Sequence, residues 1–205
     1  MEGNKKVNLA VHDRIMEGQN YFIAFMRAVN VGGHQPVSMP ALRAFLQQLG
    51  ISEPRSVLQS GNLVFRSVNS SITALEEKLE VATSERLGLN TEFFVRTASE
   101  WKRVLTENPF PEAAKAAPAH LLLLLMKSTP RKEAIIELKG SIRGQELFKV
   151  NGRQAYVVYP DGIGRSRLTL SLIEKKLGTT ATGRNWNTAL KIMALLEPLP
   201  FQGKG

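Results

Sequence analysis

The sequence predicts an α+β protein built from two tandem ferredoxin-like (βαββαβ) units, each followed by an extra helix. Two observations lead to this prediction. Short β-prone runs alternate with longer segments that have a helical apolar period, and the same order of elements occurs twice. Residue identity between the two halves is poor, so only the elements repeat. A single continuous α+β domain is the alternative.

The first unit is predicted for residues 21–108. Residues 21–27 are apolar almost throughout, as is typical of a central strand. A helix, a hairpin, a second helix, a strand and the extra helix should follow, over 39–50, 55–59 with 62–67, 71–88, 91–97 and 98–109. Ser38 and Pro40 suit the start of the first helix, and Ser60-Gly61 is a tight-turn signal.

The second unit is predicted for residues 119–197. Residues 109–118 contain three prolines without an apolar period and are interpreted as a linker. The order then repeats over 119–127, 129–140, 146–150 with 153–160, 161–178, 179–182 and 185–197. Residues 1–20 are polar and without pattern, so we expect a flexible N-terminal tail, with Met1 and Met16 both candidate starts. Residues 198–205 form the expected C-terminal tail.

Composition limits the possible functions. The 205-residue chain has no cysteine, which excludes disulfides, thiolate zinc sites and cysteine nucleophiles and fits a reducing cytoplasm. Its longest apolar run, 121–126, is too short to span a bilayer, and the N-terminus lacks the apolar core of a secretory signal. We therefore expect a cytoplasmic protein without a membrane partner.

Basic charge is concentrated in the second half. The formal net charge is +9, and residues 1–115 carry 13 Lys and Arg against 12 Asp and Glu. Residues 116–205 carry 14 against 6, a net charge of +8. This imbalance predicts an anionic small molecule or nucleic acid as partner. The alternative is a basic surface that only aids solubility.

Motifs for catalysis, cofactors and metals are missing. The sequence has no phosphate-binding G-x-x-x-x-G-K-[ST] loop, no G-x-S-x-G elbow and no H-E-x-x-H pair. The histidines, His12, His34 and His120, are far apart, and only His34 lies in a glycine loop that suits an acid-base group. We therefore expect no metal and no cofactor, and the sequence assigns no catalytic residue.

Two candidate ligand-binding segments lie in the first half. Arg27 ends a strand and leads into a loop with Asn30, Gly32 and Gly33, where glycines allow backbone amides to approach a ligand. The alternative is a simple connection to the next helix.

The second segment is the hairpin tip with Gln59, Ser60 and Asn62. Turn geometry explains the serine and asparagine but does not require Gln59, and Ser60 has no visible activating base.

A third candidate precedes a helix in the second half. Residues 161–167 combine two glycines with Arg165, Ser166 and Arg167, a pattern that favours anion binding at backbone amides and guanidinium groups. A capped loop with exposed arginines is the alternative.

The fourth candidate is the segment 182–188. Asn185 suits a helix N-cap and Trp186 suits a core position. No structural role is evident for Arg184 and Asn187. We therefore include Arg184 and Asn187 among the candidate ligand-binding residues.

Together these segments resemble the bacterial domain-of-unknown-function family 1697. The resemblance is carried by FMRAVNVGG, QSGNLVF, GIGRSRLTLSLIEKKLG and RNWNT, and extends over about residues 21–196. It implies an α+β fold and no assigned activity. The family usually has glycine in place of Ala28 and a threonine-like residue in place of Gly183. We expect the latter change to loosen the loop ahead of Arg184.

The sequence predicts binding of an anionic ligand, a nucleotide or nucleic acid, near the junction of the two halves. A small-molecule enzyme with a polar cleft that gathers Arg27, Asn30, Gln59 and Arg184 is one alternative. A structural or protein-interaction module, in which the motifs fix loops and the packing of the halves, is the other.

Overall fold

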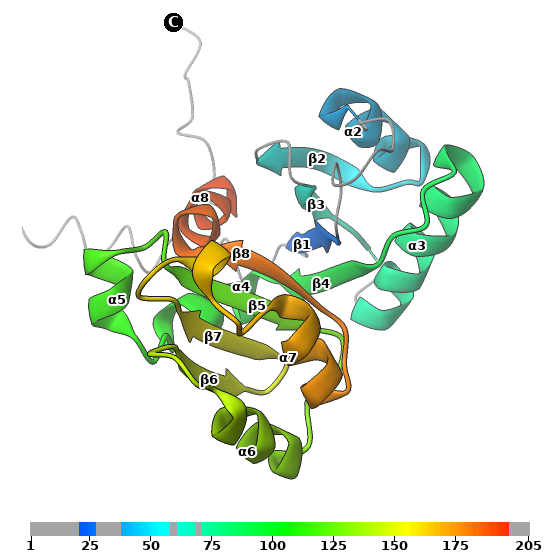
Figure 1. Cartoon of the computed structure of the whole chain (residues 1–205). Helices are drawn as coiled ribbons and strands as arrows, with labels where there is room; N and C mark the ends of the chain where they lie inside the picture. Colours follow the sequence, from blue (N-terminus) through cyan, green and yellow to red (C-terminus); the bar gives the residue numbers. More distant parts are fainter. Residues whose placement is uncertain (1–20, 28–37, 58–60, 69–70, 197–205) are drawn as a thin grey trace, which may run out of the picture.

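Two four-stranded antiparallel sheets dominate the structure (Figure 1). The computed structural model describes residues 21–27, 38–57, 61–68 and 71–196. In this part of the chain, the two sheets are accompanied by seven α-helices, α2 to α8. The prediction of an α+β fold is confirmed.

The first half of the chain forms the first sheet, in the order β2-β3-β1-β4. Its elements are β1 (Tyr21–Met26), α2 (Met39–Gln48), β2 (Ser52–Val57), β3 (Asn62–Arg66), α3 (Ile72–Leu87), β4 (Phe93–Thr97) and α4 (Ala98–Thr106). β1 takes a central position because both of its faces are apolar and become buried.

The second half forms the second sheet, in the equivalent order β6-β7-β5-β8. Its elements are β5 (Leu121–Met126), α6 (Lys132–Ser141), β6 (Leu147–Asn151), β7 (Gln154–Val158), the 3-10 turn η1 (Ile163–Arg165), α7 (Leu170–Leu177), β8 (Ala181–Asn185) and α8 (Trp186–Leu196). Along the chain, the segment that connects the two sheets and was interpreted as a linker contains a short helix, α5 (Pro111–Ala116).

Local sequence explains many of the boundaries. The side chains of Ser38 and Ser71 accept hydrogen bonds from backbone amides in the first turns of α2 and α3. Thr97 and Glu100 form a reciprocal capping box at the start of α4. Gly88 ends α3 with a φ of 63°, a left-handed conformation that costs glycine little.

One predicted boundary is wrong near the end of the chain. The sequence predicted a short strand over 179–182, but β8 runs from Ala181 to Asn185. The predicted N-cap role of Asn185 is confirmed, because α8 begins at Trp186 and Asn185 Oδ1 accepts a hydrogen bond from the Thr188 amide at 2.9 Å. Backbone pairing with β5 extends the strand as far as Asn185, opposite Leu122. Arg184 therefore lies inside a strand and not in the loop before a helix.

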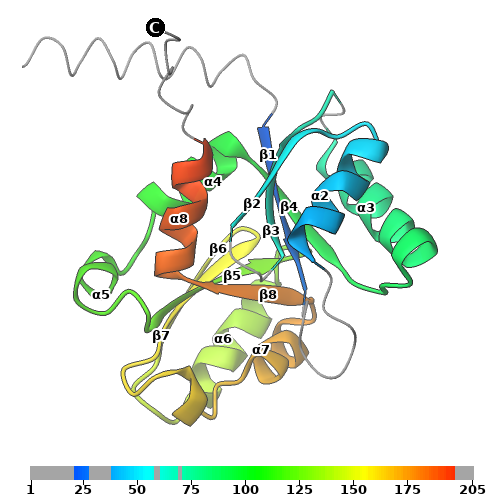
Figure 2. The same ribbon diagram turned by 90° about the horizontal axis from the view of Figure 1, so that it is seen from above.

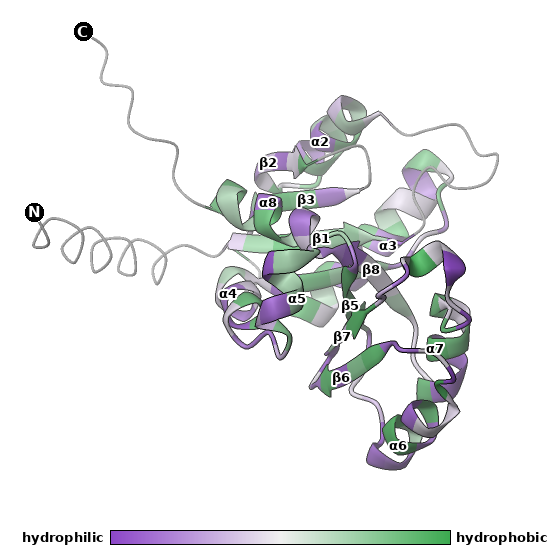
Figure 3. Ribbon diagram, turned by 60° about the vertical axis from the view of Figure 1, so that its left-hand side comes forward, coloured by the Kyte–Doolittle hydropathy of each residue, from purple (hydrophilic) through white to green (hydrophobic). Residues whose placement is uncertain are grey.

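Each sheet has an outer face covered by its own pair of helices. α2 and α3 pack on the first sheet, and α6 and α7 pack on the second (Figure 2). Alternate residues of β1, among them Phe22 and Ala24, point to the outer core, as the two-residue period of a strand requires. The apolar character of β5 and β7 is visible along their length (Figure 3).

The inner faces of both sheets share one core with α4 and α8. Ile23 and Phe25 of β1 lie in the same cluster as Leu123 of β5. The two tryptophans, Trp101 of α4 and Trp186 of α8, are 0% and 6% exposed in this inter-sheet core. The helix after each βαββαβ series therefore joins the halves, and Trp186 has the core position that the sequence predicted.

We expect the α8 side chains that face the inter-sheet core to contribute more to the stability of the protein than the exposed side chains of the same helix. Ile192→Ala, at a residue with 0% exposure, should lower the free energy of unfolding by about 2–5 kcal/mol, because it leaves a cavity between the sheets. Leu190→Ala on the same helix, at a residue that is 48% exposed, should cost well under half as much. Urea denaturation followed by tryptophan fluorescence measures both. Equal losses for the two variants would contradict a buried inner face of α8.

Candidate functional site

The structure brings three of the predicted ligand-binding residues together where the halves meet. Arg27 follows β1, Asn62 begins β3, and Arg184 lies in β8. Asn187 is exposed in the first turn of α8. The remaining first-half candidates lie outside the described residues: Asn30, Gly32, Gly33, Gln59 and Ser60.

Arg184 crosses the junction and holds both sheets. Its guanidinium donates from Nε to Oδ1 of Asn62 and from Nη2 to the Met26 carbonyl at 3.0 Å, both in the first half. Nη1 donates to Thr182 Oγ1 and to the Gly183 carbonyl, each at 2.8 Å, within its own strand. Asn62 is only 1% exposed, and its amide also donates to Val57 at 3.1 Å.

Strand register explains why these residues meet. Arg184 pairs with Leu123, and Asn62 pairs with Phe25, so all four side chains face the inter-sheet core. The Arg184 guanidinium lies 5.5 Å from the centre of the Phe25 ring, within cation–π range. Burial lowers the pKa of Arg184 to about 10, which leaves it charged at neutral pH.

Arg27 also joins the halves. It forms ion pairs with Glu92 of the first half and, at 2.9 Å, with Glu174 of the second. Glu92 accepts a hydrogen bond from Thr180 at 2.7 Å, and Glu174 accepts one from the Ala181 amide at 2.7 Å. We call Arg27, Asn62, Glu92, Glu174, Thr180 and Arg184 the junction cluster.

Burial raises the pKa of Glu92, but the hydrogen bonds from Thr180 and Arg27 outweigh burial. The net result is a pKa below the ordinary value of 4.5.

Two further cations, Lys127 and Arg96, connect the halves, and neither was predicted from the sequence. Lys127 after β5 pairs with Glu76 at 3.0 Å and with Glu80 at 2.7 Å, both on α3. Arg96 of β4 is 2% exposed and donates to the Met126 and Arg153 carbonyls of the second half at 3.0 Å each. In the sequence, Arg96 looks like an ordinary polar residue of a strand. Its partners lie in the second half of the chain, so they can be identified only from the folded structure.

Gly183 is placed in a strand and not in the predicted loop. A Cβ atom there would lie 3.2 Å from Leu122 Cδ1 and 3.3 Å from Leu124 Cδ2, closer than most real Cβ contacts. The glycine therefore lets β8 lie tightly against the leucines of β5. This close packing gives a physical reason why the chain has glycine at position 183, where the family usually has a threonine-like residue.

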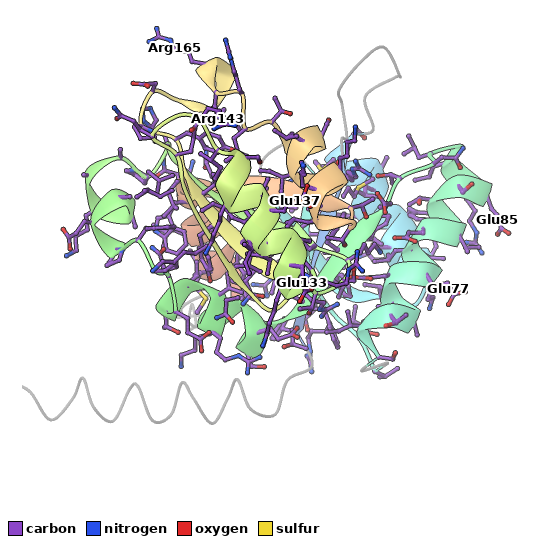
Figure 4. The ribbon with its side chains drawn as sticks, turned by 60° about the horizontal axis from the view of Figure 1, so that its bottom comes forward. Glu77, Glu85, Glu133, Glu137, Arg143 and Arg165 are labelled. Carbon is purple, nitrogen blue, oxygen red and sulfur yellow. The ribbon has the colours of Figure 1, made fainter. Side chains whose placement is uncertain are left out.

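The other two candidates, Arg165 and Ser166, lie apart from the junction cluster. With Arg143 and Arg167 they line a cavity of about 300 Å³ between the α6–β6 loop and the β7–α7 loop. We call it the basic cavity. The side chains of Arg143, Arg165 and Arg167 are exposed and form no ion pair or hydrogen bond with any described residue. Arg143 and Arg165 lie at the end of the second half remote from Glu77 and Glu85 of α3 (Figure 4).

Two carboxylates, Glu146 and Asp161, also line the basic cavity, and the cavity's own loops hold Glu146 in place. Ser166 donates to Glu146, and its Oγ accepts from the Leu168 amide at 2.9 Å. The Ser166 hydroxyl and backbone amides hold the pKa of Glu146 below its ordinary value. Burial raises the pKa of Tyr159 to about 12, and its hydroxyl donates to the Leu168 carbonyl at 2.9 Å. These contacts fix the shape of the cavity.

The described part of the chain contains no metal-binding group and no helix that could span a membrane. No group of three or more His, Cys, Asp or Glu residues there is placed to hold a metal ion. No described helix has the length and apolar character needed to cross a bilayer.

Arg143 is not among the ligand-binding residues predicted from the sequence. It lies in the loop Ser141-Ile142-Arg143-Gly144, between a predicted helix and a predicted strand. An arginine beside a glycine in such a loop was the available signal. Its proximity to Arg165 depends on how the second sheet brings the two loops together.

The chain belongs to the family described as Protein of unknown function (DUF1697), whose model matches residues 20–156. The match contains Arg27 and Asn62 and ends before Ser166 and Arg184. A comparison with curated proteins finds no significant match to the chain.

A solved structure shares the fold. The conserved bacterial protein SP0830 from Streptococcus pneumoniae superposes with a TM-score of 0.70 at 22% sequence identity. The alignment covers 88% of this chain and 100% of that protein. The similarity therefore extends over both sheets, and at this identity it concerns the fold alone.

We expect Arg184 to be a main stabilising contact between the halves. Arg184→Met should lower the free energy of unfolding by about 3 kcal/mol, because Asn62 and the Met26 carbonyl lose a charged donor. Arg103→Met, at an exposed arginine of α4, is the matched control and should change stability by less than about 0.5 kcal/mol. Chemical denaturation measures both, and equal stability of the two variants would contradict the assigned role.

Acid should weaken the junction cluster through Glu92. Because its folded-state pKa lies below 4.5, Glu92 stabilises the protein above that pH, and the contribution disappears as pH falls through the folded-state pKa. Glu92→Gln should therefore be less stable than the natural protein at neutral pH, and the difference should shrink below about pH 4.5. Urea midpoints across this range give the comparison. Glu77→Gln, at an exposed position of α3, should show no such pH-dependent difference.

Proposed function

We propose that the protein binds the anionic group of a small ligand at the basic cavity of its second half. One observation carries the proposal. Arg143, Arg165 and Arg167 line a cavity of about 300 Å³, and their guanidinium groups form no ion pairs with described residues. Glu146 and Asp161 line the same cavity, so three cations face two carboxylates and the net charge of the lining is positive. Arginine presents paired donors that match the geometry of phosphate and carboxylate groups.

The size of the cavity favours a small ligand over nucleic acid. A volume of about 300 Å³ lies at the lower end of small-molecule sites. Single-stranded nucleic acid is usually held by exposed aromatic side chains on which the bases stack. Among the described residues, the large exposed hydrophobic side chains are all aliphatic. A phosphate-bearing small molecule, such as a nucleotide or a sugar phosphate, fits these features better.

The proposal moves the expected binding site away from the junction of the halves. Arg27 is neutralised by two carboxylates, and Arg184 donates to four oxygen atoms of the protein. These contacts favour a structural role for the junction cluster, the joining of the two halves. They give little support to an enzyme with a polar cleft built on the same residues.

We further propose that residues 21–108 and 119–197 each form a ferredoxin-like unit of a cytoplasmic protein, with residues 109–118 as the connection. The equivalent strand orders β2-β3-β1-β4 and β6-β7-β5-β8 support the division. The tight packing of the inner faces, including α4 and α8, supports folding of both units as one body.

Isothermal titration with inorganic pyrophosphate at low salt tests the anion site. The natural protein should bind, and Arg165→Ala and Arg167→Ala should each weaken binding by about tenfold, because each removes a charged donor. Arg103→Ala, outside the cavity, should bind like the natural protein. Absence of binding at low salt, or binding that survives both cavity variants, would rule out this site. Tighter binding of single-stranded RNA than of pyrophosphate would favour nucleic acid instead.

A further inference from the structure

We propose that the ligand is amphipathic, a phosphate or carboxylate joined through a neutral linker to an apolar group. This inference rests on the proposed function and extends it. It follows from a second cavity beside the basic cavity, from the kind of side chains in that cavity, and from the charge of the wall that the two share.

The second cavity also has a volume of about 300 Å³ and shares Ile142 and Glu146 with the basic cavity. It lies between the start of α5, the end of α6 and strand β6, and we call it the apolar cavity. β6 is an edge strand that pairs only with β7 in the described sheet. The outer edge of β6 is therefore not covered by another described strand, and the proposed ligand extends from the basic cavity past Ile142 and Glu146 toward this edge.

Four of the seven residues that line the apolar cavity are apolar. Leu147 is 51% exposed, although it begins a strand whose next residue, Phe148, is 6% exposed and belongs to the outer core. Phe110 and Ile142 provide further apolar surface at the same place. Exposure of this leucine costs free energy in water, and an apolar group bound against it would recover part of that cost.

Two lysines also line the apolar cavity. They are Lys139 and Lys149, and the Lys149 ammonium lies 5.8 Å from the centre of the Phe110 ring. With the three arginines of the basic cavity they make both compartments more favourable for a ligand of net negative charge. A purely apolar ligand would not use these charges.

The lining residues decide which end of the ligand is charged, because the three arginines line only the basic cavity and Leu147 lines only the apolar cavity. The Glu146 carboxylate, which lines both cavities, stays ionised, because the Ser166 hydroxyl and backbone amides hold its pKa below the ordinary value. A second carboxylate or phosphate against Glu146 would be repelled. The anionic group therefore belongs among Arg143, Arg165 and Arg167, a neutral part of the ligand passes Glu146, and the apolar group lies against Leu147.

Matched ligands test the inference on the full chain. Methyl phosphate and hexyl phosphate carry the same charged group and differ in alkyl length, and hexanol has the same chain without the charge. Titration calorimetry should show hexyl phosphate binding at least about tenfold more tightly than methyl phosphate, because additional alkyl surface leaves water. Hexanol alone should bind much more weakly than hexyl phosphate.

Two variants locate the alkyl group. Leu147→Gln should remove most of the preference for hexyl phosphate and leave methyl phosphate binding unchanged, and its exposed position makes the substitution compatible with folding. Ile136→Gln, at a residue of α6 that is 70% exposed and lines neither cavity, is the matched control and should keep the full preference.

The outcomes separate this inference from the proposed function. Equal affinity for the two alkyl phosphates, with both lost in Arg165→Ala, would overturn the amphipathic ligand and retain the anion site. A preference for hexyl phosphate that persists in Leu147→Gln would exclude the apolar cavity. If pyrophosphate and both alkyl phosphates fail to bind, the anion site itself is wrong.

Discussion

Burial of the inner faces of the two sheets against each other is the interaction that the rest of the structure depends on. Each βαββαβ series covers only one face of its sheet with its own helices, so the other face needs a partner. The other half, together with α4 and α8, provides that partner, and both tryptophans lie in the resulting core. The separation of the structure into two similar halves and their union into one body have the same physical origin.

The polar contacts at the junction follow from that core. A residue that faces a second sheet must find its hydrogen bonds inside the protein, because water is excluded. Arg96 and Arg184 meet this requirement through oxygen atoms of both halves. Arg27 and Lys127 are partly exposed and pair with carboxylates across the junction. These cations orient the halves relative to one another. They are thereby occupied, whereas Arg143, Arg165 and Arg167 in the second half form no ion pair with a described residue.

The order of elements could be predicted from the sequence because strand and helix periods and turn residues are local signals. The apolar residues 121–126, the Asn151-Gly152 turn and the Ser38 cap are examples. The end of β8 could not be predicted in the same way. Asn185 pairs with Leu122 of β5, which is far away in the sequence. This pairing extends the strand into polar residues that, by local sequence alone, resemble the start of a helix.

For the site, the sequence by itself identified candidate residues, of which six lie in the described part of the chain: Arg27, Asn62, Arg165, Ser166, Arg184 and Asn187. Only the tertiary structure decided what they contact. Arg27, Asn62 and Arg184 are joined by strand register across the two sheets, while Arg165 and Ser166 are placed in a separate cavity with Arg143. The reason is that residue type and spacing fix local conformation, whereas the partner of a charged side chain is fixed by contacts between segments distant in the chain.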